Sequence, residues 1–167
     1  YGACHSCDGL GTEAFFDPQL IIPSQNLSLR EGAIAPWRET KSKYQQQILD
    51  GLSNHYKFSL DAPFFELSKM VQDALLYGTG EEEITVTFVE GIHRKSITKP
   101  FEGIIPSLEK QLNDSDTNWM REDLAKYQNS RKCLACNGNR LKKESLCVKV
   151  GELNIGEVCN MTIIELV

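Results

Sequence analysis

CHSCDGLG at residues 4–11 and CLACNGNRL at residues 133–141 are the two stretches that decide the fold of this chain. Each is a Cys-x-x-Cys turn followed by a glycine, which accepts the positive φ that lets backbone N–H groups approach the sulfurs. Together they supply four thiolates, the number that a closed tetrahedral zinc site requires. We call the stretches the first and second knuckle and predict a structural zinc bound by Cys4, Cys7, Cys133 and Cys136.

The sequence leaves open which cysteines share a metal. One shared site would close a loop over almost the whole chain and remove on the order of 4 to 5 kcal/mol of unfolded-state freedom. Structural zinc in small peptides binds with roughly 10 to 16 kcal/mol, which exceeds that term. In the alternative, Cys4 and Cys7 complete a site with another pair upstream of Tyr1. We favour the shared site because one chain then provides all four ligands.

The composition predicts a globular chain with one main core. Its 167 residues are 41% hydrophobic, and no apolar run reaches the length of a membrane span.

Paired cysteines in a Lys- and Glu-rich chain favour a reducing cytoplasm over a disulfide-bonded secreted setting. Cys147 and Cys159 lie in alternating apolar sequence and are interpreted as small core residues. Because the chain opens on a knuckle at Tyr1 and ends on an apolar run, we expect a fragment.

Four helices are predicted between the knuckles. Apolar residues at i+4 steps from Tyr44 predict a helix over residues 43–56. A second helix is expected to begin at Asp61, with a proline in its first turn, and to end at Gly78. A third follows Pro106, and a fourth begins near Thr117 with Asp116 as its cap.

The strands are predicted from alternation and turn residues. β-Branched residues at 84–88, a turn at 90–91 and a return at 94–99 indicate a β-hairpin that Pro100 ends. After the second knuckle, residues 145–150 alternate as a strand, residues 153–156 form a turn, and residues 161–167 continue toward a neighbouring sheet.

Charge is distributed unevenly along the chain. The net charge is −5, yet residues 131–149 hold six basic residues and one acid, which is 6 − 1 = +5. This stretch and the hairpin are candidate phosphate-binding surfaces, and solvated charges are an equally good interpretation. The candidate DNA-binding residues are Arg94, Lys95, Lys99, Arg131, Lys132, Arg140, Lys142 and Lys143.

Catalytic motifs are missing from the sequence. No Gly-x-x-x-x-Gly-Lys-Ser/Thr loop is present, and GTGE at 78–81 lacks the lysine of such a loop. The three histidines have no nucleophile pattern around them. We therefore expect that this part of the protein is not an enzyme. Trp37 is a candidate for stacking on a base or an adduct, although a partly buried anchor is the commoner role.

A specific set of motifs runs along essentially the whole chain. They are CxxCDGLG at 4–11, FDP at 16–18, LSL at 27–29, GAIAPW at 32–37, LYGTG at 76–80, PFEG at 100–103 and CxxCxGxRL at 133–141. These motifs, in this order, resemble the UvrA family, the damage-sensing subunits of the bacterial excision nuclease. The family usually has proline at the positions of His5 and Lys132, and neither departure removes a ligand.

The resemblance implies an α+β fold in which a helical insertion domain with a β-hairpin is closed at its neck by a four-cysteine zinc module. The implied divisions are a first knuckle at 1–12, the insertion domain at 13–130, a second knuckle at 131–144, and at 145–167 the strand-rich start of an ATP-binding segment. The whole family protein is an ABC-type ATPase that dimerises, binds damaged double-stranded DNA and loads UvrB. Its ATP site and UvrB-binding domain would lie outside these residues.

Two other hypotheses about the function of the knuckles stay open. A J-protein chaperone module also uses Cys-x-x-Cys-x-Gly-x-Gly, but it needs four closely spaced repeats and this chain has two. A structural interaction module without DNA contact also stays open, because the rest of the chain is acidic, 12 − 22 = −10 outside residues 131–149.

Overall fold

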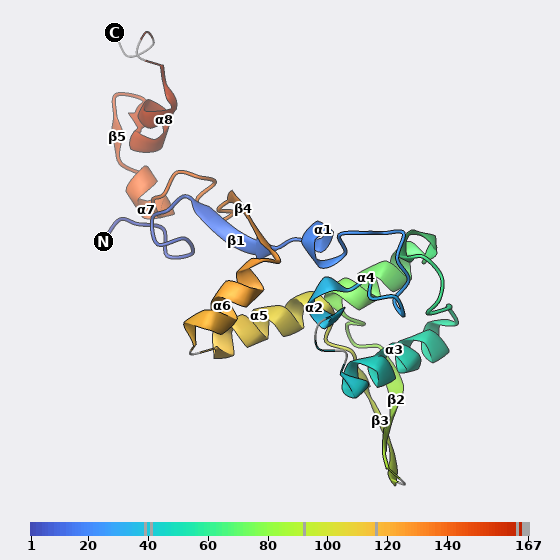
Figure 1. Ribbon diagram of the computed structural model, residues 1–167. Helices are drawn as coiled ribbons and strands as arrows, with labels where there is room; N and C mark the ends of the chain where they lie inside the picture. Colours follow the sequence, from blue (N-terminus) through green and yellow to red (C-terminus); the bar gives the residue numbers. More distant parts are fainter. Residues whose placement is uncertain (39, 41, 92, 116, 163, 165–167) are drawn as a thin grey trace. The chain divides into compact units, whose positions relative to one another are not determined.

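The computed structural model describes residues 1–38, 40, 42–91, 93–115, 117–162 and 164. The fold is α+β, as the sequence predicts (Figure 1). The chain forms two compact units: Tyr1–Phe15 with Asn129–Val167, and Phe16–Gln128. We call them the knuckle unit and the helical unit. No helix in the described ranges is long and apolar enough to cross a membrane.

The helical unit contains short helices, one 3₁₀ turn and one hairpin. Its elements are α1 (Pro18–Ile21), α2 (Ala35–Arg38), α3 (Lys43–Tyr56), the 3₁₀ turn η1 (Phe64–Glu66), α4 (Lys69–Tyr77), β2 (Glu83–Glu90), β3 (His93–Pro100), α5 (Ile104–Asp114) and α6 (Asn118–Ala125).

Helix α3 has the predicted bounds because its ends are set locally. Ser42 and Gln45 form a capping box at the N-terminus, and Lys57 ends the helix in the left-handed conformation. Ile48 and Leu52 are buried as predicted. Tyr44, which the i+4 pattern also assigned to the inner face, is instead 51% exposed.

The predicted start of α4 is wrong. Residues 64–66 form a separate 3₁₀ turn, and the helix begins at Lys69 because the Ser68 side chain accepts a hydrogen bond from the Val71 N–H. Asp61, the predicted cap, instead accepts a hydrogen bond from Arg30 at 2.7 Å. The predicted end at Gly78 is correct.

Helices α5 and α6 differ slightly from the prediction. Helix α5 begins at Ile104, so Pro106 lies within its first turn, where a backbone N–H has no helical partner to lose. Helix α6 begins directly after Thr117. The predicted cap Asp116 lies outside the described residues.

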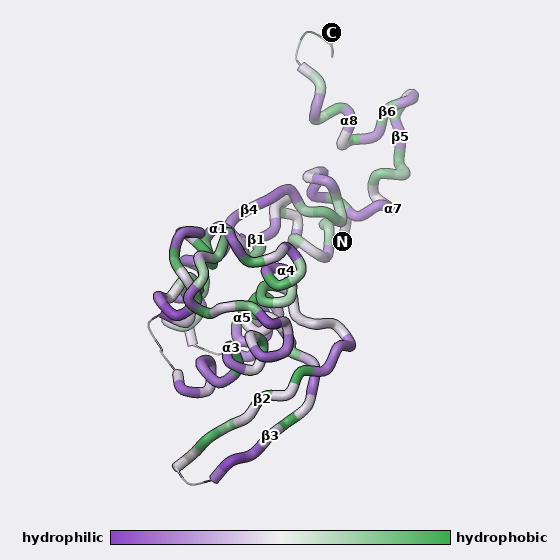
Figure 2. Tube along the Cα trace, turned by 90° about the vertical axis from the view of Figure 1, so that its right-hand side faces the viewer, coloured by the Kyte–Doolittle hydropathy of each residue, from purple (hydrophilic) through white to green (hydrophobic). Residues whose placement is uncertain are grey.

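The hairpin β2–β3 is confirmed, and its register decides which side chains share a face. Ile84 pairs with Lys99, Val86 with Ile97, and Phe88 with Lys95. This face packs on α3, since Ile84 and Val86 are buried. In Figure 2 most of β3 has the hydrophilic colour, whereas β2 is mixed.

A short network fixes the base of the hairpin to the end of α3. Glu82 accepts a hydrogen bond from the Tyr56 hydroxyl at 2.8 Å, and its other oxygen lies 2.8 Å from the His55 Nε2. Burial, together with the Glu82 carboxylate, raises the pKa of Tyr56 to about 12, so this hydroxyl stays protonated and donates.

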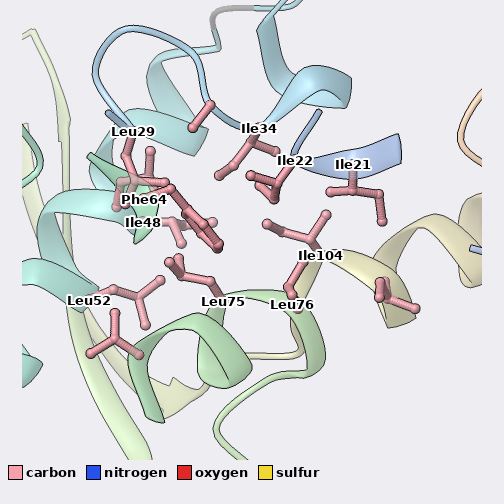
Figure 3. Packing of buried hydrophobic residues seen from close by; sticks show 14 of the residues in the cluster. Ile21, Ile22, Leu29, Ile34, Ile48, Leu52, Phe64, Leu75, Leu76 and Ile104 are labelled. Atoms are coloured by element: carbon pink, nitrogen blue, oxygen red, sulfur yellow. The ribbon is translucent and has the colours of Figure 1, made fainter. Parts of the chain in front are cut away.

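The core of the helical unit is one apolar cluster. Figure 3 shows Ile48 and Leu52 from α3, Leu75 and Leu76 from α4, and Ile104 from α5 pointing toward one another. Burial of this continuous apolar surface holds the short helices together, because helices of this length are marginal by themselves.

The knuckle unit has little regular structure. Its elements are β1 (Thr12–Phe16), which pairs with β4 (Gln128–Lys132), then α7 (Lys143–Leu146), β5 (Lys149–Val150), β6 (Leu153–Asn154) and α8 (Ile155–Asn160). Both strands of the β1–β4 pair lie next to a knuckle in the sequence. The strand that follows the first knuckle therefore pairs with the strand that precedes the second knuckle.

Several predictions after the second knuckle are wrong. Residues 145–150 do not form one strand, because residues 143–146 close a helical turn with the Leu146 N–H bonded to the Lys142 carbonyl. The predicted turn at 153–156 is a short strand followed by α8, which an Asn154–Glu157 capping box starts. Cys147 and Cys159 are exposed rather than buried, because no apolar cluster of the described residues covers them.

Candidate metal centre and nucleic-acid interface

The structure brings the four predicted cysteines into one buried cluster. Cys4 Sγ lies 4.0 Å from Cys133 Sγ, and Cys7 Sγ lies 3.7 Å from Cys136 Sγ. All four sulfurs are within 4.8 Å of one another. The cysteines of both knuckles therefore lie together within this chain, as a shared metal site requires.

The two knuckles repeat each other in backbone conformation. Asp8 and Gly9 in the first knuckle have φ values of 48° and 81°, and Asn137 and Gly138 in the second have 49° and 81°. The predicted positive φ of the glycines is confirmed. Because asparagine and aspartate tolerate the left-handed region better than most residues, each Asx-Gly pair suits this turn.

Hydrogen bonds join the knuckles reciprocally. The Cys4 N–H donates to the Arg140 carbonyl at 2.8 Å, and the Cys133 N–H donates to the Gly11 carbonyl at 3.0 Å. Gly11 and Arg140 occupy the same position after their cysteine pairs, so the two contacts are equivalent. The two knuckles are therefore related by an approximate twofold symmetry, and each contributes two sulfurs to the cluster.

The pKa values of the clustered thiols differ, so the four thiols do not all ionise together without a bound cation. Burial raises the pKa of Cys7, but the Gly11 N–H at 3.3 Å and hydrogen bonds with the neighbouring thiols lower it to about 7. For Cys133 the Cys136 N–H favours the thiolate, yet burial and the sulfurs of Cys136 and Cys7 raise the pKa to about 11. One thiol ionises readily and another does not, as expected of packed thiols that need a divalent cation to be deprotonated together.

The residues fit a tetrahedral metal with four sulfur ligands. With Zn–S bonds of about 2.3 Å, tetrahedral geometry places ligand sulfurs about 3.8 Å apart. The 4.0 and 3.7 Å separations agree with that value and exceed the length of a disulfide bond, about 2 Å. Among the described residues of the knuckle unit, the buried hydrophobic side chains are these four cysteines, so the unit has no apolar core to replace a metal.

The cations around the second knuckle have different surroundings. The Arg131 Nε donates to Glu13 at 2.8 Å, and its guanidinium lies over the Phe15 ring, 4.8 Å from the centroid. These contacts hold Arg131 on the β1–β4 ladder. The remaining predicted residues there are the exposed Lys132, Arg140 and Lys143 and the half-buried Lys142.

The hairpin cations lie on both faces of the hairpin. Lys95 and Lys99 pair with Phe88 and Ile84 on the face toward α3, whereas Arg94 pairs with Val89 on the opposite face. All three cations are exposed. They therefore do not form the single patch that their closeness in sequence suggests.

Sequence reasoning missed an aromatic cleft in the helical unit. Tyr44 stacks on Phe88 with ring centroids 5.1 Å apart and planes 8° from parallel. Both rings line a cleft with Trp37 and Phe101. Trp37 was singled out from the sequence, and it is partly buried against the core as the commoner role implies. The spacing of the aromatic residues in the sequence does not predict the cleft, because the four residues come from separate elements.

The comparison with known protein families identifies the helical unit. A family model described as the UvrA DNA-binding domain matches residues 17–126, nearly the whole of that unit. The chain belongs to this family. The resemblance found in the sequence motifs is thereby confirmed.

Curated proteins are similar to this chain along almost its entire length. The UvrABC system protein A of Rickettsia prowazekii is 47% identical over 166 residues, 99% of this chain and 17% of the relative. That of Brucella abortus is 45% identical over 163 residues, 98% of this chain and 17% of the relative. The chain thus spans about a sixth of the length of the curated relatives it matches.

A solved structure supports the fold. The crystal structure of UvrA2 from Deinococcus radiodurans aligns with a TM-score of 0.72 and 24% sequence identity, covering 93% of this chain and 20% of that one. Within the range matched by the UvrA DNA-binding domain model lie three of the eight predicted cations, Arg94, Lys95 and Lys99. The other five belong to the knuckle unit.

Proposed function

We propose that this chain is a zinc-held, DNA-contacting region of the damage-recognition subunit of the bacterial nucleotide excision repair nuclease. The family match over residues 17–126 carries the proposal, since the matching model describes a DNA-binding domain. The relatives, named UvrABC system protein A, support the repair context.

The proposed role of the metal is structural. Cys4, Cys7, Cys133 and Cys136 would hold one zinc ion with all four positions filled, which leaves none for a substrate. Zinc would supply the positive charge that lets four adjacent thiols be deprotonated together. The ligands come from both ends of the segment, so the ion would fix residues 1–12 to residues 131–144.

The proposed DNA contact is electrostatic and independent of sequence. Arg94, Lys95 and Lys99 in the helical unit, and Arg131, Lys132, Arg140, Lys142 and Lys143 in the knuckle unit, would meet phosphates. We rank the hairpin residues first, because they are exposed and lie within the range that the family model matches. Arg131 ranks last, because Glu13 and Phe15 already engage it.

The wider context comes from the family. The whole protein would be an ABC-type ATPase that binds damaged duplex DNA, pairs with a second copy and loads UvrB in the cytoplasm, with ATP bound outside these residues. We assign residues 145–167 to the start of an ATP-binding segment. That residues 1–167 have no catalytic activity of their own stays a prediction.

Charge neutralisation tests the DNA contact. The triple variant R94Q/K95Q/K99Q should bind duplex DNA at least tenfold more weakly at low salt, and its log–log salt slope should fall by up to about 2.7, since each phosphate contact contributes about 0.9. Fluorescence anisotropy across a salt series measures both. The matched control K57Q/K69Q/K110Q removes the same charge from other exposed positions of the helical unit. Equal weakening in the two variants would show that net charge alone, and not the hairpin, attracts DNA.

Elemental analysis tests the metal. The purified chain should contain zinc at a 1:1 ratio, and Cys133→Ser should lose it because its sulfur is part of the cluster. Cys147→Ser is the control, since Cys147 is exposed and outside the cluster. Full zinc occupancy in Cys133→Ser would refute the four-cysteine site.

A further inference from the structure

The aromatic cleft of the helical unit shares only Lys99 with the proposed phosphate contacts, and those contacts do not use its aromatic rings. It has a volume of about 250 Å³ and is lined by parts of α2, α3, the hairpin, residues 101–103 and α5. This is smaller than the roughly 300 to 1,000 Å³ of sites for drug-sized molecules. The space suits one flat ring system rather than an extended ligand.

The aromatic walls are arranged for stacking. Tyr44 lies nearly parallel to Phe88 and remains 51% exposed, although it lies on a helix whose apolar residues are otherwise buried. Trp37, half-buried, lines the same cleft. A planar ligand entering the cleft can therefore contact exposed aromatic surface that the fold leaves partly uncovered.

Positive charge lies beside these rings. Lys99 lines the cleft together with one acidic residue, Glu102, and Lys95 pairs with Phe88 on the same face of the hairpin. Both lysines are exposed. The α5 wall adds the Ser107 hydroxyl and the Gln111 amide, which can hydrogen-bond to the edge of a ring. Aromatic faces next to cations are the combination that binds single-stranded nucleic acid.

We propose that this cleft binds one unpaired nucleobase of DNA, stacked against Tyr44 and Trp37, with the phosphate of the same strand beside Lys99. The proposal rests on the proposed DNA contact and deepens it. A peptide side chain would also fill the space, but Lys95 and Lys99 outnumber the one lining carboxylate, Glu102, and favour a ligand with negative charge attached to its ring. The helical unit would then hold an unstacked base as well as phosphates.

The experiment uses Trp37 as its own reporter. The chain has two tryptophans, so Trp119→Phe leaves Trp37 alone. Two probes are compared: a short fully paired duplex, and the same duplex with one additional unpaired thymidine. The unpaired probe should quench Trp37 fluorescence and bind about five- to tenfold more tightly, toward the lower end of what one base–aromatic stack contributes.

Matched variants separate stacking from general effects. In the Trp119→Phe background, Tyr44→Ala should abolish the preference for the unpaired probe, whereas Tyr44→Phe should keep it. Tyr77→Ala is the control, since Tyr77 is 54% exposed on α4 and does not line the cleft. Lys99→Gln changes only an exposed side chain and should reduce the preference for the unpaired over the paired probe more than Lys110→Gln does, even if Tyr44→Ala disturbs folding.

The outcomes distinguish this proposal from the proposed function. If both probes bind equally and Trp37 is not quenched, the cleft proposal is overturned and the duplex contact stands. If only the unpaired probe binds and quenches Trp37, the cleft proposal stands and the duplex contact is overturned. If neither probe binds, both are overturned.

Discussion

Two glycines allow the backbones that flank the hairpin to touch. Gly78 and Gly103 have φ values of 97° and 95°, and a Cβ on Gly103 would lie 2.4 Å from the Gly78 nitrogen. We predict that Gly103→Ala destabilises the helical unit by about 3 kcal/mol, since backbone strain and overpacking each cost about 1 to 3 kcal/mol. Urea denaturation measures the loss.

A third glycine, Gly80, provides the control for this prediction. Gly80 has a φ of 62°, but a Cβ there would meet nothing within 4 Å. Gly80→Ala should therefore cost only about 1 kcal/mol, from the unfavourable φ alone. Equal losses of unfolding free energy for Gly80→Ala and Gly103→Ala would show that the close approach of the Gly78 and Gly103 backbones does not affect stability.

Glu31 makes the stability of the loop before α2 depend on pH. Its carboxylate accepts a hydrogen bond from the Ser28 N–H at 2.8 Å, and this bond lowers the pKa of Glu31 below its ordinary value of 4.5. A carboxyl group with a lowered pKa stabilises the folded state above pH 4.5, and the contribution disappears as the pH falls through the lowered pKa. We predict that Glu31→Gln lowers the melting temperature at pH 7 and reduces its fall under acid.

Thermal melts between pH 3 and pH 7 test this prediction, with Glu109→Gln as the control on an exposed helix position. Parallel melting curves for wild type and Glu31→Gln across that range would show that Glu31 does not contribute to the acid sensitivity.

At the scale of the element, the start of α4 is decided by Ser68. Its hydroxyl accepts the hydrogen bond from the Val71 N–H that satisfies one free donor of the first turn. We predict that Ser68→Ala costs about 1 kcal/mol, a typical value for a lost N-cap. Asp61→Ala should cost less, because an exposed ion pair such as Arg30–Asp61 contributes about 0.2 to 1 kcal/mol. Denaturant melts of both variants check the order, and a larger loss for Asp61→Ala would contradict it.

At the scale of the whole molecule, the two units depend on different stabilising forces. The helical unit buries a large apolar cluster, whereas the described part of the knuckle unit buries four cysteines. We predict that removing the metal with a chelator unfolds the knuckle unit and leaves the helical unit folded. Proteolysis should then release a fragment close to residues 16–128 that keeps its helical circular dichroism. Loss of all helical signal on chelation would show that the metal supports both units.

Features set by neighbouring residues could be predicted from the sequence. The bounds of α3 follow from its i+4 pattern, and the hairpin follows from its β-branched strands and Gly91. The four clustered cysteines follow from the Cys-x-x-Cys spacing and the glycine after each pair, which are local properties. The sequence motifs alone indicate the family that the family model confirms.

Features that depend on distant packing could not be predicted. Asp61 and Ser68 are both good caps, and the contacts of Arg30 and Val71 decide between them. The exposure of Cys147 follows from the lack of a covering element among the described residues, which alternation alone does not reveal.

The sequence by itself determined the two Cys-x-x-Cys pairs, α3, the hairpin and the family, because spacing, periodicity and turn residues act within a few positions of each other. Only the tertiary structure decided that one cluster unites the cysteines of both knuckles, that the hairpin cations lie on two faces, and that Tyr44, Phe88 and Trp37 form a cleft. The physical reason is that burial and side-chain contact depend on which distant surfaces pack together, and the local pattern does not specify that pairing.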